Sequence, residues 1–212
     1  MSTYQLFKTI PSPRNVKIAR LKDVPFGQLY IRRAGVIMVT KVLDYDSKSG
    51  RFIYKLRYCL TQDKRSLEWG DGGGCYEKVD GYSVRTAFRE LHQETLGIFD
   101  RVVPDVSEFK GRTPPPSIAN CLTVYSRSMM IIFIFVADLE LHRLEREFRN
   151  RLRLVRNPEV VRLKWFAKAE LVNLIYGNRV SDDKMYSAVQ ELLSRARGQT
   201  KGVSHLLEDY LR

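Results

Sequence analysis

The chain has 212 residues, a formal net charge of +12 at pH 7 and a sequence pI of about 9.7. A hydrophobic content of 44% with a charged content of 28% excludes a disordered chain and suits one globular domain. So basic a surface favours anionic partners such as nucleotides, RNA or acidic membranes, although a basic solubility surface explains the charge equally well.

Cysteine usage and hydropathy bear on the cellular compartment. The three cysteines are odd in number and form no Cys-x-x-Cys pair, which favours free thiols in a reducing compartment. The first residues lack the apolar stretch of a signal peptide, and the longest apolar run, 129–137, is too short to cross a bilayer as a helix. We expect an intracellular protein of the cytoplasm or nucleus with no membrane partner. The sequence leaves its oligomeric state open.

The first half of the chain predicts an arm followed by a hairpin. Residues 1–30 are basic and punctuated by prolines, and we expect an arm that packs on a single domain spanning 31–212. The segment RRAGVIMVTKVLDYD (32–46) predicts a strand, and 51–61 alternates as its returning partner. The residues between them, Ser47–Gly50, form a turn signal.

The middle of the chain predicts a helix after a glycine run. A short strand at 66–69 leads into the run WGDGGG, which we interpret as a turn. Residues 83–95 have helical period, with Ser83 as the expected N-cap. One stripe of this helix is mostly apolar, and its members are Val84, Ala87, Phe88, Leu91 and Thr95.

The second half alternates strands with helices. A strand is expected within 99–109 and a strong buried strand within 128–141. The arginine-rich segment 142–159 predicts a helix or loop, and 160–171 a strand that turns into a helix. An amphipathic C-terminal helix is expected over 182–197. This interleaving of strands and helices predicts a layered α/β fold.

Two acids on the flank of the helix at 83–95 indicate a site. Glu90 and Glu94 lie one turn apart and so share a face. Two such carboxylates can hold a hard divalent cation, and Mg²⁺ usually completes its shell with water and substrate phosphate oxygens. The glycines before the helix allow the backbone to approach closely. The pattern suits metal-assisted attack on phosphorus, although an exposed helix with solvated charges has the same pair.

The segment GGGCYEKVDGYSVRTAFRELHQETLG (72–97) resembles the Nudix box, the signature of the Nudix hydrolase superfamily. That box ends in Arg-Glu-apolar-x-Glu-Glu-x-Gly-apolar. This sequence matches it at Arg89, Glu90, Leu91, Glu94, Gly97 and Ile98. The resemblance implies a Nudix-type α/β/α sandwich with a mixed β-sheet, in which the box loop and helix carry the metal site.

The box departs from the family pattern in three places. Gln93 stands where the family has the first glutamate of its Glu-Glu pair. An amide can orient water or bind metal weakly through its oxygen, but it is neither an anionic ligand nor a base at neutral pH. One extra residue separates Gly74 from Arg89, and another, Leu96, precedes Gly97. These changes bear on the number of metal ions and on turnover more than on the fold.

The resemblance implies a role for each matching residue. Glu90 and Glu94 would bind Mg²⁺ or Mn²⁺, and Arg89 would orient the loop and the glutamates through charge-assisted hydrogen bonds. Gly73 and Gly74 would shape the loop.

Further acids and Gln93 complete the implied site. Either Asp80 or Glu77 would be a loop acid near the metal. A further glutamate after the long strand would act as metal ligand or general base. Glu159 is our candidate for it, and Glu140 and Glu147 are weaker ones. Gln93 is counted with the catalytic group because of its position.

Two features bear on the substrate, a nucleoside diphosphate linked to another group. Nudix enzymes that act on ADP-ribose commonly have a proline about sixteen residues beyond the box, and Pro114 lies 16 residues after Ile98. We therefore favour an ADP-ribose type of substrate, with Pro114 and Arg33 as substrate-binding candidates. An ordinary rigid loop explains the proline equally well.

The basic surface supports a second substrate, capped RNA. Arg149, Arg151 and Arg153 belong to a run of cations that would attract RNA phosphates, as in the Nudix decapping enzymes of large DNA viruses. A solvated helix is an equal interpretation of this segment. A third reading is a nucleotide- or RNA-binding Nudix module without catalytic activity.

Overall fold

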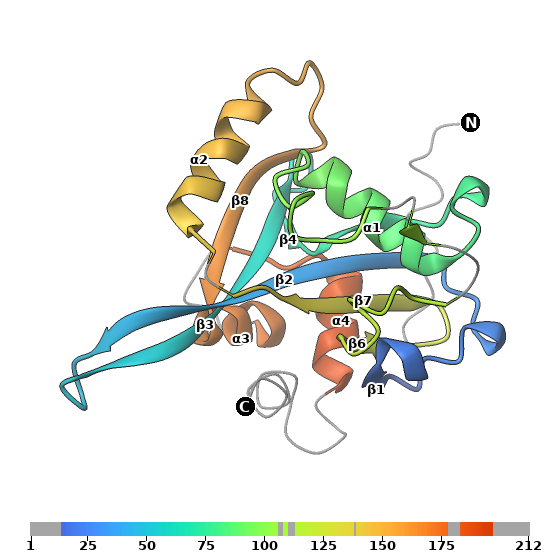
Figure 1. Ribbon diagram of the computed structural model, residues 1–212, viewed down its shortest axis with the longest axis horizontal. Helices are drawn as coiled ribbons and strands as arrows, with labels where there is room; N and C mark the ends of the chain where they lie inside the picture. Colours follow the sequence, from blue (N-terminus) through green and yellow to red (C-terminus); the bar gives the residue numbers. More distant parts are fainter. Residues whose placement is uncertain (1–13, 106–107, 110–112, 138, 178–182, 197–212) are drawn as a thin grey trace.

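The computed structural model describes residues 14–105, 108–109, 113–137, 139–177 and 183–196 (Figure 1). This part of the chain is a mixed α/β structure with an eight-stranded mixed sheet and four α-helices. The strands are β1 (Lys17–Arg20), β2 (Arg33–Asp46), β3 (Arg51–Asp63), β4 (Trp69–Gly70), β5 (Gly72–Cys75), β6 (Leu122–Tyr125), β7 (Met129–Phe135) and β8 (Val160–Ala167). The helices are α1 (Ser83–Glu94), α2 (Leu141–Leu152), α3 (Lys168–Tyr176) and α4 (Ser187–Arg195).

Strand β2 is the centre of the sheet. The main path runs β1-β6-β7-β2-β3-β4, while β5 also pairs with β2 and β8 also pairs with β3. The β2–β7 pair is parallel, and the other strand pairs are antiparallel. Because β7 is fully apolar and lies beside β2, it is buried over most of its length, as its sequence predicts.

Helices cover both faces of the sheet. One core joins the apolar stripe of α1 and Phe148 of α2 to one face of β2 and β7. A second core joins α3 and α4 to the opposite face, around Trp69 and Phe166. The apolar stripe predicted for the helix at 83–95 is buried throughout. The layered α/β architecture expected from the sequence is confirmed.

The predicted hairpin forms and the predicted glycine turn does not. Strands β2 and β3 pair from Met38↔Cys59 to Asp46↔Arg51 around the expected turn. Of the run 69–74 interpreted as a turn, Trp69–Gly70 is strand β4, and the glycines at 72–74 belong to strand β5, which pairs with residues 33–36 of β2. Glycine weakens a strand interior, but it also marks sites where another backbone approaches closely, as residues 33–36 do here.

Three other expectations were tested by the described residues. The strand expected within 99–109 is wrong for the described part of that segment, which contains turns, a bend, irregular backbone and a 3-10 position at Glu108. Tyr82, not Ser83, is the N-cap of α1, and its side chain makes no capping bond. The C-terminal helix is present as α4, while Asp182 and Arg197, the ends expected for it, lie outside the described residues.

Residues of the expected basic arm also enter the sheet. Lys17–Arg20 pairs with Leu122–Tyr125 as edge strand β1, and residues 1–13 of that arm lie outside the described part. Across the described ranges, no helix combines the length and apolar character needed to cross a membrane.

Candidate active site

The glycines of β5 allow α1 to lie very close to the sheet. A Cβ atom at Gly74 would stand 2.4 Å from the carboxyl carbon of Glu90, and one at Gly73 would stand 2.5 Å from the Cα of Gly35. A side chain at position 73 would clash with the backbone of β2, and one at position 74 would displace the Glu90 carboxylate. The Glu90 carboxylate therefore rests directly against the β5 backbone, in a cradle that any side chain at position 74 would fill.

Arg89 is the hub that ties α1 to the loop before it. Its Nε and Nη2 donate to the two oxygens of Asp80 at 2.8 and 3.1 Å, and Nη2 also donates to the Cys75 carbonyl at 3.1 Å. Its Nη1 donates to Glu90 Oε1 at 2.7 Å and to Gln93 Oε1 at 3.0 Å. One guanidinium thus fixes the loop and both neighbouring side chains of the helix, because its donors form a rigid planar fork.

The two candidate loop acids have different environments. Asp80 is buried and accepts hydrogen bonds from the Glu77 amide, Thr86 Oγ1 and Arg89. Burial alone would raise the pKa of Asp80, but these hydrogen bonds outweigh it and hold the pKa below its ordinary value. Glu77 is exposed, with Oε1 3.6 Å from Arg89 Nη1. Since the Asp80 oxygens are occupied by protein donors, Glu77 is the loop acid with accessible oxygens.

Glu90 and Glu94 are held differently. Glu90 is only 8% exposed, and burial raises its pKa against the opposing charge of Arg89. Glu94 is partly buried, and its Oε2 accepts a hydrogen bond from Thr61 Oγ1 on β3 at 2.9 Å. Burial raises the pKa of Glu94 well above its ordinary value; Asp71 and Glu90 add to this, and Arg33 opposes it. The two carboxylates repel each other in a poorly hydrated setting, so a bound cation would relieve both.

Glu159 reaches the same region from the other end of the sequence. It is exposed and immediately precedes β8, where its carbonyl accepts a hydrogen bond from the Lys64 amide at 2.8 Å. Its charge contributes to the raised pKa of Glu90. The antiparallel pairing of β8 with β3 therefore brings this acid into the electrostatic neighbourhood of α1, although it is distant in sequence.

The extra residue in the box lies where α1 ends. Leu96 and Gly97 have φ angles of 56° and 70°, in the left-handed region. This conformation is uncommon for leucine and ends the helix. The Leu96 carbonyl accepts a hydrogen bond from Arg151 Nη1 at 2.6 Å. The insertion is thus absorbed in a turn after Glu94, and the spacing from Arg89 to Glu94 along the helix is unaffected.

Arg33 and Asp71 form a buried ion pair beneath the site. Arg33 Nη1 and Nη2 donate to the two Asp71 oxygens at 2.9 and 2.6 Å, and Nη2 also donates to the Gly73 carbonyl at 3.0 Å. The Arg33 guanidinium lies over the ring of Tyr186, with its Cζ 5.3 Å from the ring centroid. Arg33 was a substrate-binding candidate, and its terminal nitrogens are used within the protein. Sequence reasoning did not single out Asp71, whose only local signal is one acid within WGDGGG.

The other substrate-binding candidates fall into two groups. Pro114 is buried in the segment that precedes β6. Arg151 is partly buried; it links α2 to the turn after α1 by donating to the Leu96 carbonyl, and it forms an ion pair with Glu147 within α2. Arg149 and Arg153, by contrast, are exposed at the end of α2. Only these last two present their side chains to solvent as an RNA-binding surface requires.

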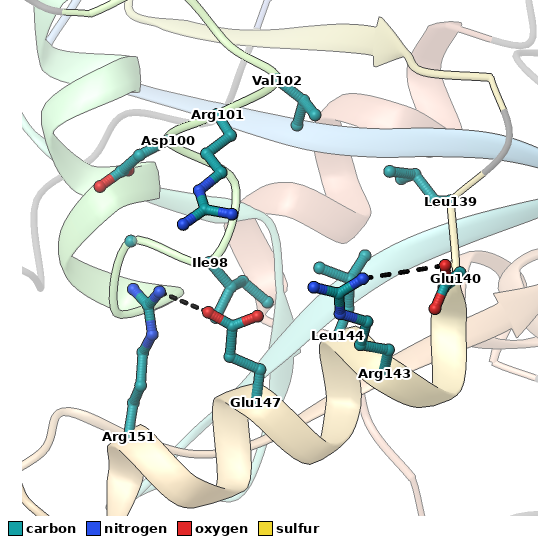
Figure 2. Close-up of a pocket in the computed structure, with 11 residues that line it drawn as sticks. Ile98, Asp100, Arg101, Val102, Leu139, Glu140, Arg143, Leu144, Glu147 and Arg151 are labelled. Atoms are coloured by element: carbon teal, nitrogen blue, oxygen red, sulfur yellow. Dashed lines mark hydrogen bonds and ion pairs between the residues drawn. The ribbon is translucent and has the colours of Figure 1, made fainter.

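A pocket of about 410 Å³ lies between α2 and the turn after α1 (Figure 2). Its walls carry acids and bases in equal number together with apolar side chains, and Arg101 extends its guanidinium into the space in Figure 2. The weaker acid candidates Glu140 and Glu147 line this pocket, where they pair with Arg143 and Arg151. They therefore belong to this pocket, whereas Glu159 is coupled to Glu90.

The donor chemistry of α1 fits a hard divalent cation. Among the described residues, no group of three or more His, Cys, Asp or Glu side chains forms a ready-made metal site. Glu90 and Glu94 nevertheless supply carboxylate oxygens, and Mg²⁺ is commonly held by one or two carboxylates with water and substrate phosphates. The cradle at Gly74 keeps one of these carboxylates in place.

Comparison with protein-family models and with curated proteins gives no relative. No protein-family model matches the sequence, and no curated protein shows significant similarity to it. Any functional assignment therefore rests on the residues and their geometry.

Proposed function

We propose that this protein is a divalent-metal-dependent pyrophosphohydrolase of the Nudix type, which cleaves the phosphoanhydride of a nucleoside diphosphate derivative. The observation that carries the proposal is the arrangement around Arg89, which orients Glu90 while Glu94 lies one turn further along the same helix. Glu90 is buried and Glu94 partly buried, and both carboxyl groups have raised pKa values beside a glycine-lined backbone, so their ionised forms would be stabilised by a bound cation.

The chain's own residues supply orientation and proton transfer. Mg²⁺ or Mn²⁺, when bound, would polarise a phosphoryl oxygen and lower the pKa of an attacking water. Arg89 donates a hydrogen bond to the Glu90 carboxylate, and Thr61 donates one to Glu94, which orients both acids. Glu159 is exposed and close enough to affect Glu90, which suits it to accept a proton from water. Gln93 can orient a water through its amide but adds no charge.

A hydrolysis screen tests this function. The protein would be incubated with ADP-ribose, dinucleoside polyphosphates, deoxynucleoside triphosphates and capped RNA, with Mg²⁺, with Mn²⁺ or with excess chelator. We expect cleavage of at least one substrate that depends fully on the metal. Undiminished cleavage in chelator would contradict the mechanism, and binding without cleavage of any substrate would identify a non-catalytic module.

Capped RNA is a second candidate substrate beside the ADP-ribose type. The observation that favours it is the exposure of several cations in the segment that leads from α2 to Glu159 and into β8. These residues are Arg149, Arg153, Arg156 and Arg162. A substrate of the ADP-ribose type does not extend over so wide a surface, whereas the phosphates of an RNA body do.

Replacing Arg149 and Arg153 with alanine should separate the two substrates. We expect weaker binding of capped RNA and a salt dependence whose logarithmic slope falls by about 1.4 for two lost phosphate contacts on a single strand. Hydrolysis of ADP-ribose should change little. Arg151 is left intact because it supports the end of α1. The measurement is fluorescence anisotropy across a salt series, with ADP-ribose kinetics in parallel.

The matched control replaces two exposed arginines at the far edge of the sheet, Arg20 on β1 and Arg127 before β7. It removes the same net charge from a distant surface, so its effect on RNA binding should be much smaller. Equal losses in both double variants would mean that net charge alone attracts RNA. Equal losses on RNA and ADP-ribose would mean that Arg149 and Arg153 support the pocket or the fold.

A further inference from the structure

The hairpin of β2 and β3 extends beyond the rest of the sheet (Figure 1). Its outer part exposes large apolar side chains that β-strands normally bury. Leu43 is 59% exposed, Tyr45 55%, Phe52 68% and Tyr54 70%. A contiguous apolar patch of this kind on a strand pair marks an interaction surface more often than a free surface.

All four side chains lie on one face of the hairpin. Leu43 pairs with Tyr54 and Tyr45 with Phe52, and directly paired residues of antiparallel strands share a face. The rings of Tyr45 and Phe52 are in edge-to-face contact, with centroids 5.5 Å apart. The face continues the alternation that, nearer the centre of the sheet, buries Ile37, Val39, Tyr58 and Leu60 against α3 and α4. The hairpin therefore carries an apolar core face beyond the helices that cover it.

Charged residues occupy the opposite face. Asp44 lies 3.2 Å from both Lys55 Nζ and Arg57 Nη2, so these charges satisfy one another. The pairing Asp46↔Arg51 places both residues on this face too. Lys41, two residues before Leu43 on the same face of β2, lies over the ring of Phe135. An RNA partner needs cations beside the stacking rings, whereas this segregation of charge suits an apolar partner.

We propose that this face docks a second copy of the chain, in a two-fold arrangement of hairpin against hairpin. Aromatic side chains bury roughly 150–250 Å² each, so the exposed parts of the three rings present on the order of 400 Å² per chain, and Leu43 adds to it. Two such faces together bury on the order of 1,000 Å², the lower end for a specific interface. A closed two-fold dimer covers the patch on both chains at once, so no exposed patch remains to bind further chains into a filament.

Sedimentation velocity of the full chain, from low to high micromolar concentration, tests the proposal. We expect a monomer–dimer equilibrium. Replacing Phe52 and Tyr54 with threonine, which retains β-propensity, should weaken dimerisation at least about 100-fold, because central aromatic residues dominate interface energies. The matched control is Ile53→Thr, between them on the charged face, which should dimerise like the wild type. Circular dichroism should show native folding in all variants, and Tyr54→Thr alone serves if the double variant does not fold.

Several outcomes would overturn the proposal. They are a wild-type chain that stays monomeric at every concentration, a double variant that dimerises as strongly as the wild type, and an Ile53→Thr variant that also dissociates. A labelled oligouridine is added in a second arm. If it binds the monomer and loses affinity in the double variant, the face binds single-stranded nucleic acid and the dimer assignment is wrong.

Discussion

Glu94→Gln is expected to lower metal-dependent hydrolysis at least about 100-fold while the protein remains folded, since it removes an anionic ligand without changing the size of the side chain. Thr61 can still donate its hydrogen bond to the amide oxygen, so the side-chain position is retained. The measurement is kcat/KM on the substrate identified by the hydrolysis screen, with Mg²⁺ and Mn²⁺ titrated separately.

The same substitution should not lower the stability of the metal-free protein, although it lowers the activity. Because the folded state raises the pKa of Glu94, ionised Glu94 destabilises the fold above that raised pKa. The stabilising effect of the protonated form is fully present below the unfolded-state pKa and is lost as pH rises through the folded-state pKa. Glutamine stays neutral throughout, so urea unfolding of metal-free Glu94→Gln at neutral pH should show stability equal to or above that of the wild type. The difference should shrink in acid.

A metal titration distinguishes a ligand from a scaffold residue. Added Mg²⁺ or Mn²⁺ should raise the thermal midpoint of the wild type, since a ligand that binds only the folded state stabilises it. The midpoint of Glu94→Gln should rise much less. Glu145→Gln, the same change on α2, is the control and should keep both the activity and the metal-induced shift. Full activity of Glu94→Gln, or an unchanged metal shift, would contradict the role given to Glu94.

Local patterns were enough to predict the helix that carries Glu90 and Glu94, but not strand β5 beside it. The stripe from Val84 to Leu91 identified α1, because helical period is recorded in neighbouring residues. The hairpin and β7 were predictable for the same reason, from alternation and a continuous apolar run. Strands β1 and β6 have four residues each, too few for a periodic signal, and neither was predicted.

Contacts between distant segments could not be predicted from the sequence. Asp71 is buried because Arg33 lies across the β2–β5 pair, and nothing near WGDGGG encodes that pairing. The hydrogen bonds from Arg89 to Asp80, which leave Glu77 as the accessible acid, likewise depend on how the loop folds over α1. Cation counts gave Arg33 and Arg151 the same role as exposed arginines, since charge patterning does not reveal burial.

Removing Asp71 is expected to give the largest loss of stability. Asp71→Ala leaves the Arg33 guanidinium buried without its partner, and breaking a buried ion pair in this way costs about 3–5 kcal/mol. The side chains of Arg33 and Asp71 are 7% and 0% exposed, so water cannot replace the lost contact. Strand β5 should loosen as well, because Arg33 also donates to the Gly73 carbonyl. The measurement is urea unfolding with constant m-value.

A double-mutant cycle separates the energy of the Arg33–Asp71 interaction from the cost of burying an unpaired charge. Asp71→Ala leaves the Arg33 charge buried without a partner, and Arg33→Met removes that charge. The double variant should therefore be more stable than Asp71→Ala alone. Asp44→Ala, which breaks a solvent-exposed pair on the hairpin, is the control and should change stability far less. If Asp71→Ala were as mild as Asp44→Ala, the pair beneath the glycines would not hold β5, and the position of the Glu90 cradle would have to depend on Arg89 and the loop instead.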